Sequence, residues 1–300
     1  MQEKSLIIWH LTDNKRGHQN QSLGLVNAIK ELTPSESYLI DITDLRLIDL
    51  ITKRFPAGEK LPLPDLLVGA GRKSQLGLLV AKRCFGGATV CLMKPSWPTA
   101  LFDLCVIPHH DRPNHSKKIF HTIGVLNNLN PVDVKSSPMG IILIGGPSKH
   151  YNWDNGEFLT QISNIVCSNQ QISWCITDSP RTPSDLTIKL RHHTQLKAFY
   201  RPFRTSEDNW LQEYLPRCRE IWVSEDSVSM IYEALSTDAE VGLVSVPKRR
   251  ETRVTKISED LIASELVMSP SSTNRPKKIQ LNEAKRVASF LVNDWMKNHV

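Results

Sequence analysis

Short apolar runs alternate with longer amphipathic segments along almost the whole of this chain. Ser5–His10, Tyr38–Ile42 and Asp65–Gly69 read as strands, and apolar residues at helical spacing mark Asn20–Leu32 and Lys73–Arg83 between them. This alternation is typical of a parallel sheet flanked by its crossover helices. It therefore predicts an α/β fold, which two further strands, Thr89–Leu92 and Asp103–Ile107, continue.

The alternation is interrupted once and then resumes. Residues 127–140 (NNLNPVDVKSSPMG) are rich in Asn, Pro and Ser without a hydrophobic period, as is typical of an interdomain linker. The strands and helices predicted beyond it are Ile141–Ile144, Gly156–Cys167, Ile172–Thr177, Leu196–Tyr200, Glu207–Tyr214, Glu220–Val223, Asp226–Leu235 and Glu240–Val244. A last amphipathic helix is predicted over residues 281–298.

The length of the chain fits two domains. With 300 residues and 40% apolar content, it can bury two cores of ordinary size. We predict two Rossmann-like domains facing a central cleft, over residues 1–135 and 136–280. In open parallel sheets ligands bind at the carboxyl ends of the strands, so the loops there are the candidate sites.

Charge and composition narrow the classes of partner. A net charge of +6 favours anionic partners such as nucleotides, phosphorylated sugars or lipid headgroups. No aromatic platform interleaves with the basic residues, which argues against nucleic acid. The apolar run Leu6–Leu11 is too short for a signal peptide or a membrane span. Six cysteines without CxxC pairing predict reduced core thiols, and hence a cytoplasmic protein, with any membrane contact peripheral.

Three polar loops follow predicted strands in the first half. In residues 12–24 (TDNKRGHQNQSLG), Asp13 and His18 can act as a general base or bind a hydroxyl. Residues 69–75 (GAGRKSQ) lack both dinucleotide and ATP fingerprints, and we expect them to line the cleft. In residues 108–111 (PHHD), His110 or Asp111 fits an acid–base or substrate-contact role. No second cluster with ligand spacing supports a metal site.

Further polar loops follow strands in the second half. Residues 144–151 (IGGPSKHY) and 177–183 (TDSPRTP) offer backbone N–H groups, hydroxyls and positive charge that suit a diphosphate. The residues expected to contribute are Gly145, Gly146, Ser148, Lys149, Ser179 and Arg181. The basic run 247–256 is either a third basic contact or, as is more usual for a run of charges, a solvated loop.

Residues 222–235 (WVSEDSVSMIYEAL) are the most informative stretch of the chain. Either Asp226 or Ser224 is expected to cap a helix there. Asp226, Ser229 and Glu233 then share one face near the helix start, where free N–H groups suit a phosphate or a sugar hydroxyl.

With these motifs in view, the chain resembles the mitochondrial-fission Elm ("elongated mitochondria") family. The matching segments are WHLTDNKRGHQNQSLGL, PDLLVGAGRKS, FDLCVIPHHD, LIGGPSKHY, TDSPRTP and VSEDSVSMIYEAL, which span residues 9–235 in order. The resemblance implies a GT-B-like fold related to glycosyltransferases. It further implies a donor site in the second domain, an acceptor side in the first domain, and a final helix that packs back onto the first domain.

The resemblance also implies roles for single residues. Gly145, Gly146 and Ser148 would meet the diphosphate of the donor. The residues implied to line the rest of the donor site are Ser227, Ser229, Met230 and Glu233, with Glu233 on the ribose or sugar hydroxyls. His18 is our first choice for the catalytic base, followed by Asp13 or Asp111.

We therefore expect a metal-independent glycosyltransferase. It would transfer a sugar from a nucleotide-activated donor, as substrate rather than cofactor, to a cell-envelope saccharide or lipid-linked acceptor at the inner membrane. The alternative is a non-catalytic adaptor that recruits protein partners at a membrane, as plant relatives do in organelle division. An adaptor would not require the donor-loop residues, which this chain holds together.

Overall fold

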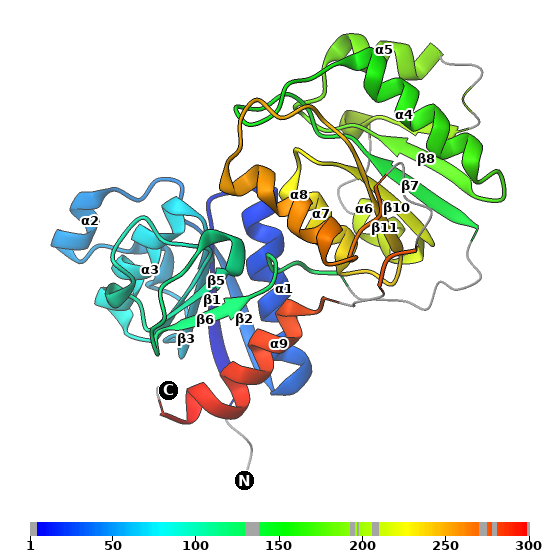
Figure 1. Ribbon diagram of the computed structural model, residues 1–300. Helices are drawn as coiled ribbons and strands as arrows, with labels where there is room; N and C mark the ends of the chain where they lie inside the picture. The colour runs from blue at the N-terminus through cyan, green and yellow to red at the C-terminus, as the bar shows by residue number, and fades with distance from the viewer. Residues whose placement is uncertain are drawn as a thin grey trace. The chain divides into compact units, whose positions relative to one another are not determined.

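In the computed structural model the first half of the chain forms one six-stranded parallel sheet (Figure 1). Its strands are β1 (Leu6–Thr12), β2 (Ser35–Asp41), β3 (Leu66–Ala70), β4 (Ala88–Leu92), β5 (Leu104–Pro108) and β6 (Ile119–Thr122). They lie in the order β2-β1-β3-β4-β5-β6. The helices of this part are α1 (Arg16–Leu32), α2 (Leu47–Thr52), α3 (Arg72–Phe85) and, from the end of the chain, α9 (Glu283–Phe290).

The second half forms a five-stranded parallel sheet. Its strands are β7 (Met139–Leu143), β8 (Ser173–Thr177), β9 (Ala198–Arg201), β10 (Glu220–Ser224) and β11 (Glu240–Val244). They lie in the order β11-β10-β7-β8-β9. The helices are α4 (Asn155–Ser168), α5 (Ser184–His192), α6 (Trp210–Tyr214), α7 (Val228–Leu235) and α8 (Arg253–Ala263).

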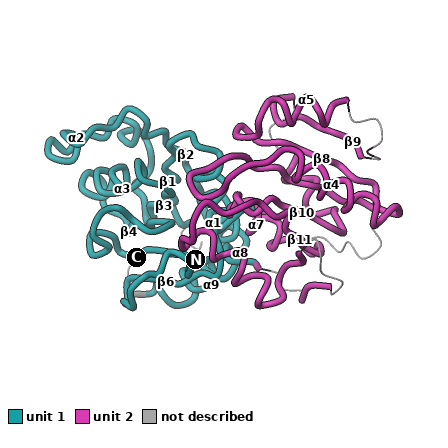
Figure 2. Tube along the Cα trace, turned by 45° about the horizontal axis from the view of Figure 1, so that its top comes forward, with its two compact units in different colours: residues 1–128, 282–300 teal, residues 129–281 magenta. Residues whose placement is uncertain are grey.

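The chain divides into two compact units, shown in Figure 2. Unit 1 comprises residues 1–128 and 282–300, and unit 2 comprises residues 129–281. The prediction from sequence divides the chain at residues 135 and 280. The structure describes residues 5–129, 138–192, 196, 198–205, 210–269, 275–277 and 281–298. Most of the predicted linker and the first three residues of the predicted helix Glu207–Tyr214 lie outside these residues.

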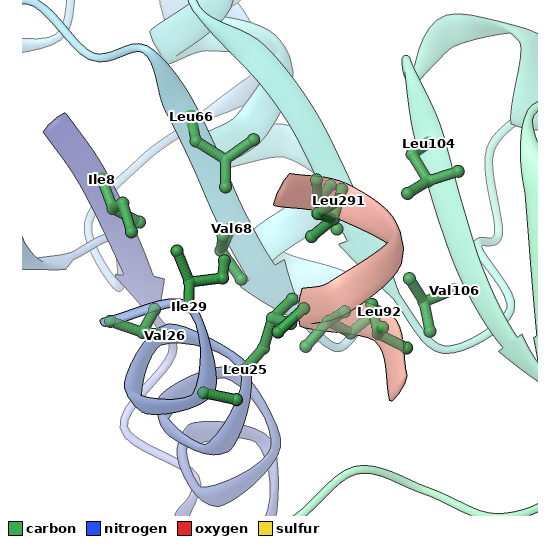
Figure 3. Packing of buried hydrophobic residues seen from close by; sticks show 14 of the residues in the cluster. Ile8, Leu25, Val26, Ile29, Leu66, Val68, Leu92, Leu104, Val106 and Leu291 are labelled. Carbon is green, nitrogen blue, oxygen red and sulfur yellow. The ribbon is translucent and has the colours of Figure 1, made fainter. Parts of the chain in front are cut away.

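The core of unit 1 follows from the alternation of side chains along its strands. On β1, Ile8 faces one layer of apolar side chains and Trp9 faces the other. In the first layer, Leu25 and Ile29 of α1 meet Leu291, which directly follows α9 (Figure 3). Helix α9 thus packs against α1 within unit 1. After Phe290 the helix continues as a π-helical turn to Trp295 and a 3₁₀ turn to Asn298.

Several elements differ from the prediction. The basic run 247–256 is not wholly a loop, because α8 begins at Arg253. Thr252 caps that helix by accepting a hydrogen bond from the N–H of Thr255 at 3.2 Å, a signal that the surrounding charges obscure. Strand β6 and the short helix α2 were not predicted, since four to six residues are too few to show a period.

The described residues contain no membrane-spanning helix, no metal-binding cluster and no disulfide. In the part of the chain that the structure describes, no helix is both long and apolar enough to cross a membrane. Among the same residues, no group of three or more His, Cys, Asp or Glu side chains could hold a metal ion. All six cysteines are free thiols.

His10, buried on β1, should make stability depend on pH. Its Nε2 lies 2.6 Å from Oγ of Ser22, and burial, with a smaller contribution from the charge of Lys30, lowers its pKa to about 4. The unfolded chain takes up this proton near the ordinary pKa of about 6.5. The free energy of unfolding should therefore be unaffected by this group above pH 7 and fall by about 2 kcal/mol from pH 7.5 to 5. Urea denaturation of wild type and His10→Gln checks this, because only the variant should lack this contribution.

Candidate functional site

Each sheet has one point where the chain reverses its direction of strand addition. In unit 1 the chain adds β2 on one side of β1 and β3 on the other, so the reversal lies between β1 and β3. In unit 2 it lies between β7 and β10 for the same reason. Helices leave opposite faces of the sheet at such a point and open a crevice at the carboxyl ends of the strands. Most of the predicted site residues lie at these two places.

At the unit 1 reversal, Asp13 and His18 form a hydrogen-bonded pair. Asp13 follows β1 directly, and its carboxylate is fully buried. His18 lies in the first turn of α1, with Nδ1 3.0 Å from both carboxylate oxygens. Asp13 thereby fixes the orientation of the imidazole and directs Nδ1 inward, leaving Nε2 as the nitrogen available to a substrate. His18 retains 22% of its side-chain exposure. The structure brings together two of the three residues predicted to be catalytic.

Asp111, the third residue, lies elsewhere along the same edge. It ends a 3₁₀ turn that follows β5, and its carbonyl oxygen accepts a hydrogen bond from Nζ of Lys94 at 2.9 Å. Two strands, β3 and β4, separate β5 from β1, which corresponds to about 14 Å. Asp111 is therefore not a neighbour of the Asp13–His18 pair, and we do not retain it as a candidate base.

Gly71 is a functional position that the sequence did not single out by itself. It precedes α3, has a φ of +88°, and lies so close to His18 that an added Cβ would collide with Nδ1. The glycine in the 69–75 loop thus makes room for the imidazole. By contrast, Gly17 lies within α1 with open space around it.

Gly71→Ala should therefore displace His18. We expect a loss of about 1–2 kcal/mol in the free energy of unfolding, because a left-handed conformation is strained for alanine. Gly17→Ala is the matched control and should stabilise α1 by roughly 0.5–1 kcal/mol. Urea denaturation of the two variants measures both effects. Equal stabilities would show that the left-handed conformation at Gly71 imposes no constraint.

At the unit 2 reversal, the expectation that two glycines expose their N–H groups is wrong. The N–H of Gly145 donates to Oγ of Ser224 at 2.8 Å, and that of Gly146 donates to Oδ2 of Asp226 at 3.0 Å. A Cβ on Gly145 would collide with the Asp226 carboxylate, and one on Gly146 with the backbone of Arg181. The glycines therefore allow three loops to meet closely, and their N–H groups are already bonded within the chain.

Ser179 and Arg181 hold these loops together. Oγ of Ser179 donates to the carbonyl oxygen of Gly145 at 3.0 Å. Nη1 of Arg181 donates to the carbonyl oxygen of Gly146 at 3.0 Å, and Nη2 lies 2.8 Å from Oδ2 of Asp226. The carboxylate of Asp226 thus neutralises the guanidinium expected to grip phosphate. The remaining loop cation, Lys149, is exposed, whereas Ser148 accepts hydrogen bonds from the N–H groups of His150 and Tyr151.

Helix α7 begins two residues later than predicted. Its first residue is Val228, its N-cap is Ser227, and no side chain caps it, because Ser224 and Asp226 are bonded to the glycine loop instead. The first hydrogen bond of the helix runs from the N–H of Ile231 to the carbonyl oxygen of Ser227. Among the described residues, the N–H groups of Val228, Ser229 and Met230 have no acceptor. These groups form a suitable site for an anion.

Two carboxylate side chains beside this helix start hold oxygens without a described partner. Oδ1 of Asp226 is buried and has no hydrogen bond among the described residues. Glu233, one turn after Ser229, makes no side-chain hydrogen bond or ion pair within the same described part of the chain. Burial raises the pKa of Glu233 to about 7. Carboxylates left without donors near a helix start suit the hydroxyl groups of a bound sugar.

Known proteins resemble this chain in sequence and in fold. The family described as mitochondrial fission ELM1 matches residues 16–295. The "Uncharacterized protein RP120" of Rickettsia prowazekii (strain Madrid E) is 23% identical over 344 residues, which cover 95% of this chain and 97% of that protein.

Solved structures extend the comparison to the fold. Staphylococcus aureus MnaA with UDP has a TM-score of 0.53 at 12% identity, covering 98% of this chain and 90% of its own. The UDP-GlcNAc 2-epimerase of Methanocaldococcus jannaschii, in complex with UDP-GlcNAc and UDP, has a TM-score of 0.52 at 14% identity, covering 96% and 99%. The Neisseria meningitidis enzyme of the same name, bound to UDP-GlcNAc, scores 0.51 at 10% identity, covering 98% and 93%. The predicted GT-B-like fold of two Rossmann-like domains is confirmed.

Proposed function

We propose, from the premise that this chain belongs to the mitochondrial fission ELM1 family, that it is a glycosyltransferase using a nucleotide-activated sugar. The acceptor would be a saccharide or lipid-linked molecule of the cell envelope. The observation that carries the proposal is the Asp13–His18 pair, a histidine oriented by a buried carboxylate at a strand-reversal point. An adaptor would have no need of such a pair.

In this proposal unit 2 binds the donor. The uncapped N–H groups of Val228, Ser229 and Met230 bind the diphosphate, with Lys149 adding positive charge. Ser227 and Ser229 supply hydroxyl groups, and Glu233 accepts hydrogen bonds from the ribose. Asp226 and Arg181 hold the glycine loop in place, so neither is the main phosphate ligand.

Unit 1 supplies the base. Nε2 of His18 removes the proton from the acceptor hydroxyl as its oxygen bonds to the anomeric carbon of the donor sugar. The bond from that carbon to the diphosphate breaks, and the nucleoside diphosphate leaves with the bonding electron pair. The Asp13 carboxylate stabilises the imidazolium that forms.

Thermal unfolding with nucleoside diphosphates and nucleotide sugars tests the donor site. A ligand at 100 times its dissociation constant stabilises by about 2.7 kcal/mol, a shift of roughly 5–10 °C in melting temperature for a unit of this size. Lys149→Gln should reduce the shift, whereas Lys189→Gln, exposed on α5, should not. A chain that binds none of these ligands would be an adaptor.

An epimerase would isomerise the sugar nucleotide without releasing nucleoside diphosphate.

A further inference from the structure

The carboxyl edge of the unit 1 sheet carries a row of exposed cations that the proposed transfer reaction does not use. Lys15 follows β1, Arg72 and Lys73 follow β3, Lys94 follows β4, and Arg112 follows β5. These four strands are neighbours in the sheet, about 5 Å apart. We call these five residues the cationic edge.

Carboxylates of the chain neutralise this edge only in part, and Asp41 at the end of β2 interacts electrostatically with Lys73. Lys15 lies 3.7 Å from Asp13, whose oxygens already bind His18 at 3.0 Å. Nζ of Lys94 donates to backbone carbonyls at 2.9 and 3.4 Å. Within the described ranges, neither Arg72, Lys73, Lys94 nor Arg112 forms an ion pair.

Elsewhere in unit 1 some exposed cations are paired with carboxylates. Lys82 lies 2.6 Å from Asp103, and Arg286 lies 2.6 Å from Glu283. Others, such as Lys53 and Arg54, form no ion pair among the described residues, so the cationic edge is distinguished by its position at the ends of four neighbouring strands.

The two helices that start at this edge add to the imbalance. Helices α1 and α3 both begin with an arginine, have no acidic residue in the first turn, and have no side-chain cap. Helices α4 and α9 are capped by Asp154 and Asn282 and carry an acidic residue in the first turn. Cations beside a helix start repel its partial positive charge. An anion bound here would therefore be stabilised by the cations and by the helix start.

We infer that the cationic edge binds a phosphate or diphosphate group carried by the acceptor. An arginine fork and several ammonium groups match the multiple oxygens and charges of phosphate better than a single carboxylate. The Asp13–His18 pair lies on the same edge, so bound phosphate would hold the acceptor with a hydroxyl near Nε2. That the bound molecule is the acceptor rests on the proposed function, whereas the anion site itself rests on the charges of unit 1.

Calorimetric titration of the full chain with inorganic pyrophosphate tests the inference. Arg72→Gln/Lys73→Gln should weaken binding by about tenfold or more. The control Lys53→Gln/Arg54→Gln removes two exposed, consecutive cations from the same unit and should leave the affinity unchanged within about twofold. An equal loss in both variants would reduce the effect to net charge and overturn the inference.

Amine acylation read by mass spectrometry locates the bound probe, since the proposed donor site can also take up pyrophosphate. Pyrophosphate should protect Lys15, Lys73 and Lys94 but not Lys53 or Lys60. Absence of this protection contradicts the inference even if nucleotides bind. Protection in a chain that binds no nucleotide would leave the anion site standing and refute the proposed donor site.

Vesicles containing phosphatidic acid identify the source of the phosphate. Sedimentation with these vesicles that is lost in Arg72→Gln/Lys73→Gln would assign a lipid-linked phosphate. Pyrophosphate binding without vesicle binding would assign a soluble phosphorylated acceptor. If pyrophosphate does not bind, and the double variant sediments with the vesicles as well as wild type does, the cationic edge is not the site.

Discussion

Replacing His18 by Asn should lower kcat by about 10²–10⁴-fold, the usual contribution of a general base. The amide of Asn can still donate a hydrogen bond to the buried Asp13, so the substitution removes the proton acceptor while retaining a partner for the carboxylate. The affinity for the nucleotide should be unchanged, because every proposed donor ligand belongs to unit 2. The measurement is the release of nucleoside diphosphate from the donor found by thermal unfolding, with a cell-envelope extract as acceptor.

Two further variants make the result specific to the pair. Asp13→Asn should also lower kcat, because an amide can leave the imidazole in the wrong tautomer. His192→Asn changes an exposed histidine at the end of α5 and should have no effect. If His18→Asn retains turnover within about threefold, another group is the base.

The fold was predictable where local signals are long and repeated. Alternation along β1 assigns Ile8 and Trp9 to opposite layers, and the structure places them there. The spacing of Val287, Leu291 and Trp295 indicates an apolar helical face, but only family resemblance indicated which core would bury it. Shorter elements gave no period to detect, and α8 was hidden because a Thr–Thr capping box lies within a run of charges.

The unit 2 loops show what a single sequence cannot supply. Glycines after a strand suggest free N–H groups, yet the partners of Gly145 and Gly146 come from residues about 80 positions away. Asp226 reads equally well as a helix cap or as the counter-charge of Arg181, and only the tertiary fold decides between them. His18 and Asp13 were predictable because they are five positions apart and one βα turn positions both.

Glu233 requires a correction to the expectation drawn from sequence. A ribose-binding carboxylate in an open cleft would make few contacts, so its replacement should scarcely affect folding. The structure instead buries most of this side chain without a described partner, which raises its pKa to about 7. An acid whose folded pKa is raised destabilises the fold above that pKa and has no effect below its unfolded pKa, near 4.5. A carboxylate kept at such a cost in stability is characteristic of functional sites.

Glu233→Gln should therefore stabilise the fold and weaken nucleotide binding. At pH 8 the free energy of unfolding should rise by about 3 kcal/mol, whereas at pH 4.5 the variant and wild type should differ little. Nucleotide affinity at pH 8 should fall by about 1–3 kcal/mol, since ribose hydroxyls lose a charged acceptor. The affinity of wild type should also decline below pH 7 as Glu233 takes up a proton, and that decline should vanish in the variant. Urea denaturation and calorimetric titration, with the exposed Glu213→Gln as control, measure both effects. Greater stability without weaker binding would make Glu233 a buried charge that contacts no ligand.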